Sequence, residues 1–261
     1  MDEKKRLLKK KAYNFEDLLS IMRILRAPDG CPWDREQTHV SVRGNFIEEV
    51  YEACEAIDQN DSGLLCEELG DVLLQVVLHC DIAEDFDIDN VCDGICKKLI
   101  YRHPHIFSDS AAETSEKVLS TWERLKSQEK GHNTYTESLN AVAKSLPALI
   151  RAQKVQQRAA KSGFDIENIE ISFIKIKEEL DEAAKEVYNN DGNFEEELGD
   201  LLFAVVNAAR FKGVSAEQAL SKATEKFMAR FEKVENEALS RGKTMKDFSA
   251  AELDEIWERI K

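Results

Sequence analysis

Apolar residues recur every three to four positions along most of this 261-residue chain, which is the period of an α-helix. The pattern is clearest from Phe46 to Ile57 and from Leu69 to Val77. No segment of any length shows the apolar–polar alternation of a β-strand, and the chain has only four prolines. The pattern therefore predicts an all-α fold.

Capping and helix-breaking residues set the expected helix bounds in the first half. Asn14 or Ser20 begins a helix that runs to about Arg26. Residues 28–34 then break it, because the prolines and glycine there favour a turn. Asp89 is the expected N-cap of a later helix that runs through Tyr101. The other helices expected in this half span residues 46–58, 64–84 and 116–129.

The second half repeats this order of elements after a short polar segment, residues 131–136, which is the best candidate for a domain boundary. A helical connector is expected over residues 141–160, interrupted near Pro147 and ended by Gly163, since glycine suits a left-handed cap. The helices expected after it span residues 171–189 and 194–212, then a long helix from the cap Ser215 to Arg241, and finally residues 250–260. The predicted organisation is a tail (1–14), a first unit (15–130), a connector (131–165) and a second unit (166–261).

The same pair of acidic motifs appears in both halves. A Glu-Glu-x-x-Glu motif at residues 48–52 precedes a Glu-x-x-Asp motif at 68–71, and the pair returns at 178–182 and 197–200. Residues three apart share a helix face, and a short connection makes two helices antiparallel neighbours, so four carboxylates can converge. The candidate metal ligands are Glu49, Glu52, Glu68 and Asp71 in the first half, and Glu179, Glu182, Glu197 and Asp200 in the second.

Such a cluster is costly without a cation. Two like charges about 4 Å apart repel by roughly 4 kcal/mol at an effective dielectric constant near 20. The carboxylates therefore either splay into water or hold an ion, and oxygen ligands favour Mg²⁺ or Mn²⁺ before zinc. One such motif alone is typical of a solvated helix face, but its recurrence favours the metal site. Gly70 and Gly199 each cost a helix about 1 kcal/mol relative to alanine, which indicates close approach of a backbone or a ligand.

Basic residues recur after each acidic pair. A Lys-x-x-x-Arg pair is followed by a tryptophan and then a lysine four residues later, although each piece alone is typical of a charged face or of a core tryptophan. Paired cations beside a metal cluster indicate a phosphate chain held between Mg²⁺ and Lys/Arg. The candidate substrate-binding residues are Lys98, Arg102, Trp122 and Lys126 in the first half, and Lys226, Arg230, Trp257 and Lys261 in the second, with Lys175 as a further candidate.

Charge and cysteine content limit the classes of partner. A formal net charge of −15 argues against nucleic-acid binding and against an anionic membrane surface. No apolar run is long enough to span a bilayer, and residues 1–11 lack a hydrophobic signal core, so we expect a cytoplasmic protein. The six cysteines form no C-x-x-C pair, and Cys54, Cys66 and Cys80 are expected to be buried free thiols.

The motifs together resemble the MazG family of nucleoside triphosphate pyrophosphohydrolases. The resemblance covers residues from about 15 to 261 and includes three segments besides the acidic pairs, namely residues 30–39, 102–107 and 146–165. It implies two tandem four-helix units, assembled as a homodimer. It also implies Mg²⁺-dependent cleavage of a nucleoside triphosphate to the monophosphate and pyrophosphate, with the acidic and basic residues above as ligands and nucleotide contacts. In the family the second unit is often the competent one, and on that resemblance we expect the second unit to be the active one here. The first unit nevertheless keeps every acidic and basic position.

Attack of water at the α-phosphorus requires charge stabilisation and a base. Glu178, and Glu48 in the first unit, are the candidate catalytic bases, because each adjoins the ligands without being the best-matched ligand itself. We expect a broad base preference.

Two other classes stay open. A ferritin-like di-iron protein would need Glu-x-x-His motifs, whereas both short motifs here end in aspartate and the second unit has no histidine. A nucleotide-sensing or dimerisation module would bind Mg²⁺ and nucleotide without turnover.

Overall fold

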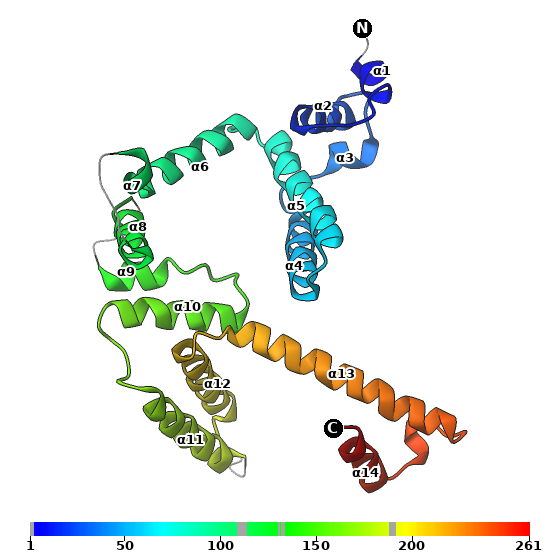
Figure 1. The fold of residues 1–261 in the computed structure, drawn as a ribbon, viewed down its shortest axis with the longest axis vertical. Coiled ribbons are helices and arrows are strands. Elements are labelled where there is room, and N and C mark those ends of the chain that lie inside the picture. The colour runs from blue at the N-terminus through cyan, green and yellow to red at the C-terminus, as the bar shows by residue number, and fades with distance from the viewer. Residues whose placement is uncertain (1–2, 109–113, 130, 132–133, 188–191) are drawn as a thin grey trace. The chain divides into compact units, whose positions relative to one another are not determined.

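The computed structural model describes residues 3–108, 114–129, 131, 134–187 and 192–261. Every regular element in these residues is a helix, which confirms the all-α fold (Figure 1). The chain divides into two compact units, Met1–Lys126 and Ser127–Lys261, each with one acidic pair. None of the described helices is long and apolar enough to cross a membrane.

The first unit centres on the antiparallel pair α4 and α5, which lie side by side (Figure 1). Asn60 ends α4 in the left-handed conformation, at φ 55°, and the Asp61 carboxylate caps the start of α5. This tight connection places the two acidic motifs on neighbouring helices. The helices of this unit are α1 (Glu3–Leu8), α2 (Phe15–Arg26), α3 (Pro32–Glu36), α4 (Arg43–Gln59), α5 (Ser62–Ile82), α6 (Ile88–Arg102), α7 (Pro104–Phe107) and α8 (Ser115–Glu129), whose last turn continues into the second unit.

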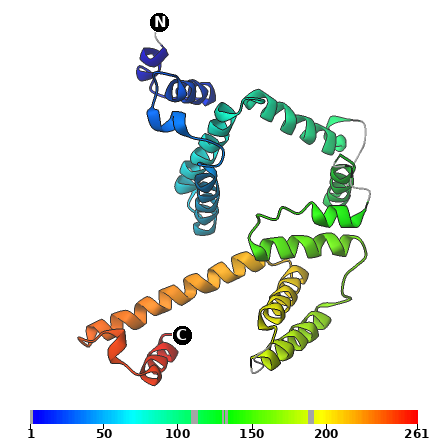
Figure 2. The same ribbon diagram turned by 180° about the vertical axis from the view of Figure 1, so that it is seen from behind.

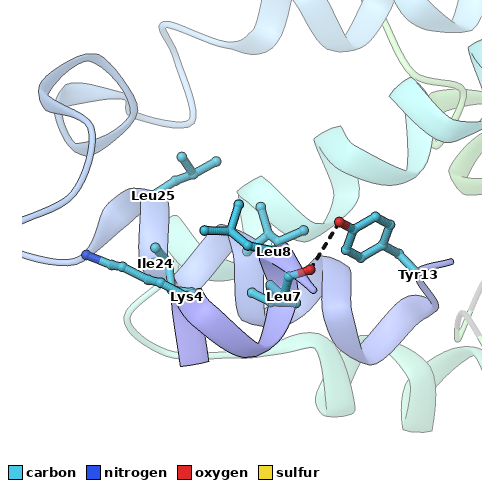
Figure 3. A pocket seen from close by; sticks show the side chains of 7 residues that line it. Lys4, Leu7, Leu8, Tyr13, Ile24 and Leu25 are labelled. Atoms are coloured by element: carbon cyan, nitrogen blue, oxygen red, sulfur yellow. Dashed lines mark hydrogen bonds between the residues drawn. The ribbon is translucent and has the colours of Figure 1, made fainter. Parts of the chain in front are cut away.

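The core of the first unit lies between α2 and α5. Its buried residues are Leu19, Met22, Val42, Val77 and Leu78. Helix α1 lies in the segment expected to be a tail, and an apolar pocket of about 270 Å³ separates parts of α1 and α2. Leu7 and Leu8 line this pocket, where the Tyr13 hydroxyl donates a hydrogen bond to the Leu7 carbonyl (Figure 3).

The second unit repeats the acidic helix pair as α11 and α12, which pack together along their length (Figure 2). Helix α10 covers α12, and α14 packs against α13. The Gln156 side chain donates a hydrogen bond of 2.8 Å to the Phe203 carbonyl, which fixes α10 on α12. The elements of this unit are α9 (Tyr135–Asn140), α10 (Ala148–Lys161), α11 (Ile169–Glu186), α12 (Phe194–Phe211), α13 (Ala216–Ser240), η1 (Met245–Asp247) and α14 (Ala250–Ile260).

Several expected helix ends are confirmed. The Asn14 side chain caps α2 and the Ser215 side chain caps α13. Gly163 follows α10 at φ +85°, a backbone conformation that a side chain strains. The expected end of α11 at Asn189 lies outside the described residues.

Other expectations were wrong. Asp87, not Asp89, is the N-cap of α6, because Asp87 has the extended backbone and exchanges hydrogen bonds with Asn90. Residues 141–147 are not helical, since α10 begins only after Pro147. Cys80 is buried, but Cys54 and Cys66 are exposed, although all three thiols are free as expected.

Candidate active site

Three carboxylates of the second unit meet between α11 and α12. Glu179, Glu197 and Asp200 each offer an oxygen, and these oxygens all lie within 4.8 Å of one another. The arrangement follows from the helix period, because Glu197 and Asp200 share a face of α12 and Glu179 faces them from α11. Glu182 is outside this group of three, but its charge acts on Glu197.

The carboxylates of this cluster repel one another. Burial raises the pKa of Glu197 above its ordinary value, and the nearby charges of Glu182, Asp200 and Glu179 raise it further. A proton or a cation would relieve this repulsion. Lys175 lies one turn before Glu179 on α11 and forms an ion pair with Glu178. The hydrogen bond that Lys175 donates to Glu178 raises the pKa of the lysine.

The first unit has the same arrangement between α4 and α5. Glu49, Glu68 and Asp71 offer oxygens within 4.8 Å of one another. Burial is the largest cause that raises the pKa of Glu49, followed by the charges of Asp71 and Glu52. The pKa of Glu68 is also raised, by burial and then by Glu52 and Asp71. Glu52, the fourth expected ligand, is outside this group of three, but its charge acts on Glu49 and Glu68.

Both clusters fit a hard divalent cation. Their donors are carboxylate oxygens alone, and neither group includes a histidine or a cysteine. Mg²⁺ and Mn²⁺ prefer such ligands, and a divalent charge would offset the repulsion that raises the pKa of Glu68 and Glu197. The residues therefore fit the metal expected from the sequence.

The glycines beside the clusters do not contact another backbone within the described residues. A Cβ atom placed on Gly70 or Gly199 would meet no atom within 4 Å. Of the two alternatives expected from the sequence, close approach of a backbone is therefore not found among the described residues, and close approach of a ligand stays a prediction.

The basic and aromatic residues of the second unit form a separate group on α13 and α14. The Arg230 guanidinium lies over the Trp257 ring at 5.9 Å from its centroid, and it donates a hydrogen bond of 3.4 Å to the Lys261 main-chain oxygen. The Lys261 ammonium forms an ion pair with Glu258 at 2.9 Å. Lys226 lies one turn before Arg230 on the exposed surface of α13.

One residue of this group was not foreseen from the sequence. The Phe227 ring lies 5.3 Å from the Trp257 ring, in a tilted arrangement, and it stacks on Phe231 at 6.2 Å. Alignment of the two repeats could have pointed to Phe227, because Phe227 follows Lys226 in the second repeat whereas Leu99 follows Lys98 in the first. The aromatic ring at this place therefore distinguishes the second unit from the first.

In the first unit the matching tryptophan is covered by cations instead. The Lys126 ammonium lies 4.5 Å from the Trp122 ring centroid, and the Arg102 guanidinium lies 5.3 Å from it. Lys98 lies one turn before Arg102 on α6. Two of the cations expected in this set, Arg102 and Lys126, thus both contact Trp122.

Within the described residues of the second unit, no hydrogen bond or ion pair joins the acidic cluster to Lys226, Arg230 or Lys261. Lys175 behaves differently among the described cations of the expected set. Its charge acts on the acidic cluster, because it interacts with Glu179 and Glu182 as well as with Glu178. The structure thus gathers the expected residues into two groups, one acidic and one basic and aromatic.

Two all-α units that each gather carboxylates on an antiparallel helix pair define a tandem helical protein with candidate divalent-cation sites. The model of the MazG nucleotide pyrophosphohydrolase domain matches residues 37–107 and again residues 170–235. Both matched ranges contain one of the acidic clusters. The chain belongs to the MazG nucleotide pyrophosphohydrolase family, and it is accordingly a hydrolase.

Two relatives that match this chain over nearly their whole length agree with this assignment, and a third matches it over about half of its own length. The nucleoside triphosphate pyrophosphohydrolase of Escherichia coli K12 is 43% identical over 251 residues, which cover 94% of this chain and 95% of that protein. A protein of Thermotoga maritima named nucleoside triphosphate pyrophosphohydrolase/pyrophosphatase MazG is 44% identical over 95% of both chains. The uncharacterized protein YabN of Bacillus subtilis is 45% identical over 95% of this chain, which matches 52% of that protein.

Proposed function

We propose that this protein hydrolyses nucleoside triphosphates to the monophosphate and pyrophosphate, with Mg²⁺ as its cofactor and the second unit as the main active unit. The observation that carries the proposal is the convergence of Glu179, Glu197 and Asp200 within 4.8 Å. Relatives of nearly the same length carry names for this activity.

Glu179, Glu182, Glu197 and Asp200 would hold the metal in the second unit, and Glu49, Glu52, Glu68 and Asp71 in the first. The bound ion supplies positive charge that offsets the negative charge of the phosphate chain. Mn²⁺ is expected to replace Mg²⁺, because both ions prefer carboxylate oxygens.

The chain's own residues then have distinct tasks. Lys226 and Arg230 bind phosphate oxygens, because ammonium and guanidinium groups form charge-assisted hydrogen bonds with them. Glu178 accepts the proton of the attacking water, because it directly precedes the proposed ligand Glu179 and is held in place by its ion pair with Lys175. Glu48 is the matching base of the first unit.

Trp257 and Phe227 hold the nucleobase. Every base presents a π-face, so stacking on an aromatic ring tolerates different bases. The contacts at this place are aromatic rather than a pattern of hydrogen-bond donors, which supports a broad base specificity.

The working form is proposed to be a homodimer. Exposed apolar side chains run along both acidic helix pairs, including Ile47 and Leu73 in the first unit and Phe173, Leu180 and Leu202 in the second. An exposed apolar surface of this extent is typical of an interface. A second copy of the chain would cover these faces.

The proposal is tested by pyrophosphate release from a panel of purine and pyrimidine triphosphates, with and without Mg²⁺, using the whole chain. Release that needs the metal supports it. Nucleotide binding without any release would instead favour a non-catalytic module and would overturn the proposed activity.

A further inference from the structure

One acidic residue ties the last helix of the second unit to the long helix α13. Arg259 of α14 donates a hydrogen bond of 2.7 Å to the Glu237 Oε1 atom. Arg241, one turn after Glu237 and just past the end of α13, forms an ion pair with the same oxygen. Glu237 therefore joins two cations, one on α14 and one at the C-cap of its own helix.

This ion pair adds to an apolar contact surface between the helices. Val234 and Ala238 are buried on α13, and Ile256 is buried on α14. Apolar packing holds two helices together, but it resists rotation of one helix about its own axis less well than a directed hydrogen bond. The hydrogen bond from Arg259 to Glu237 therefore limits the rotation of α14 relative to α13.

The pair lies beside the residues proposed to hold the nucleotide. Arg230, Val234, Glu237 and Arg241 follow a three-to-four spacing, so they lie along one face of α13. On α14, Arg259 stands between Trp257 and Lys261 in the sequence. A rotation of α14 would therefore move Trp257 away from Phe227 and Arg230.

The Glu237 carboxylate is held in its charged form. Partial burial acts to raise its pKa, but hydrogen bonds from Arg259 and Arg241 outweigh this and lower the pKa below its ordinary value. The side chain is only 26% exposed, which limits screening by water.

The helix that carries this acid is longer than its counterpart in the first unit. Helix α13 continues for fourteen residues after Lys226, to Ser240, so Lys226 and Glu237 share one continuous helix. The matching helix α6 ends at Arg102, four residues after Lys98. The length of α13 is thus what lets one helix hold both the proposed phosphate-binding residues and the acid that contacts α14.

We propose that Glu237 is a positioning residue of the second unit, which orients α14 through Arg259 so that Trp257 faces Phe227 and Arg230. The inference rests on the proposed function of this group as the nucleotide-binding surface. Glu237 itself does not contact the nucleotide in this proposal.

The test compares Glu237→Gln with Glu235→Gln in the full-length protein. Glu235 is an exposed residue of α13 two positions away, and it is a matched control for the loss of one charge. We expect Glu237→Gln to raise KM about 5-fold while kcat changes less than about 2-fold, whereas Glu235→Gln leaves both unchanged. The triple variant Glu237→Arg, Arg259→Glu, Arg241→Gln restores the pair with reversed charges and removes the repulsion that Arg241 would exert on an arginine at position 237, so it should return KM to within about 2-fold of the wild type.

A spectroscopic readout separates orientation from activity. In the background Trp33→Phe, Trp122→Phe, Trp257 is the remaining tryptophan, so its emission reports its contacts with Phe227 and Arg230. Glu237→Gln should shift that emission and the charge-reversed pair should restore it. An unchanged emission, or an equal rise of KM in Glu235→Gln, would overturn the positioning role. Failure of the wild type to release pyrophosphate would overturn the proposed function alone, because the emission still tests how α14 is held.

Discussion

Lys175 forms an ion pair with Glu178 one turn away on α11, directly beside the carboxylate cluster of the second unit. The hydrogen bond with Glu178 raises the pKa of Lys175, so the lysine keeps its charge next to the carboxylate. A carboxylate that lies next to ligand positions and is oriented by an ion pair is suited to accept a proton from a bound water.

Replacement of that carboxylate tests its role as the base. We expect Glu178→Gln to lower kcat by about 100-fold or more, the usual contribution of a positioned base, with little change in KM. Steady-state pyrophosphate release measures both constants. Glu48→Gln is the matched control in the first unit, and a similar kcat in both variants would assign the proton transfer to another group.

The two acidic clusters can be separated by paired substitutions. Glu197→Gln with Asp200→Asn removes two proposed ligands from the second unit, and Glu68→Gln with Asp71→Asn removes the matching two from the first. Each pair lowers the negative charge by the same amount, so effects of overall charge cancel. We expect the second-unit variant to lose activity by about 100-fold or more, and the first-unit variant to keep most of it.

Titration calorimetry with Mg²⁺ alone gives a second measurement for these variants. Each pair of substitutions should abolish binding at its own cluster and leave binding at the other. Full activity in the second-unit variant would place catalysis in the first unit instead.

The aromatic pair of the second unit predicts a change in substrate binding. Trp257→Leu removes a stacking surface, which contributes about 1–3 kcal/mol per base, so KM should rise roughly 5- to 150-fold. Phe227→Leu, which copies Leu99 of the first unit, should have a smaller effect of the same kind. Kinetics with a purine and a pyrimidine triphosphate check this, and an unchanged KM in Trp257→Leu would remove the ring from the binding surface.

The acidic clusters could be predicted from sequence because each needs only the helix period and a short connection that makes two successive helices antiparallel neighbours. Residues three apart on a helix share a face whatever the rest of the fold does, so Glu197 and Asp200 had to lie together. The contact of Phe227 with Trp257 depends on how α14 packs against α13, which local spacing does not determine. Asp87 and Asp89 are both good capping residues, and only the extended backbone at Asp87 decides between them.

The ion pairs of Asp17 were also beyond prediction, because they depend on α1 folding back onto α2. Asp17 is 1% exposed and bonds with Lys10, Arg6 and the Asn14 main-chain amide. The hydrogen bond from Lys10 is the largest cause that lowers its pKa, from 3.8 to about 2.

This shift predicts a pH-dependent stability. A carboxyl group with a lowered pKa stabilises the folded state at pH values above its unfolded pKa, here 3.8. That contribution is lost as the pH falls from 3.8 through about 2. Asp17→Asn should therefore lower Tm at pH 7 by about 3 °C or more, and the difference from the wild type should shrink as the pH falls through this window.

Thermal unfolding followed by circular dichroism measures this difference in Tm, with the exposed Glu16→Gln as the control. A difference in Tm that stays constant from pH 7 to pH 2 would contradict the role of the charge.

The exposed apolar faces predict how the chain assembles. Phe173 and Leu180 lie seven residues apart on one face of α11, and their side chains are 62% and 51% exposed. A charge on that face would have to lose its hydration in an interface, which is unfavourable without a partner charge. Phe173→Glu with Leu180→Glu should therefore shift the protein from dimer to monomer in sedimentation-velocity experiments at micromolar concentration.

Leu8→Glu, at an apolar position of α1 that is 83% exposed, is the control and should leave the dimer intact. A wild-type protein that sediments as a monomer at every concentration would refute the proposed assembly, because the apolar surface of α11 would then face water in the working enzyme.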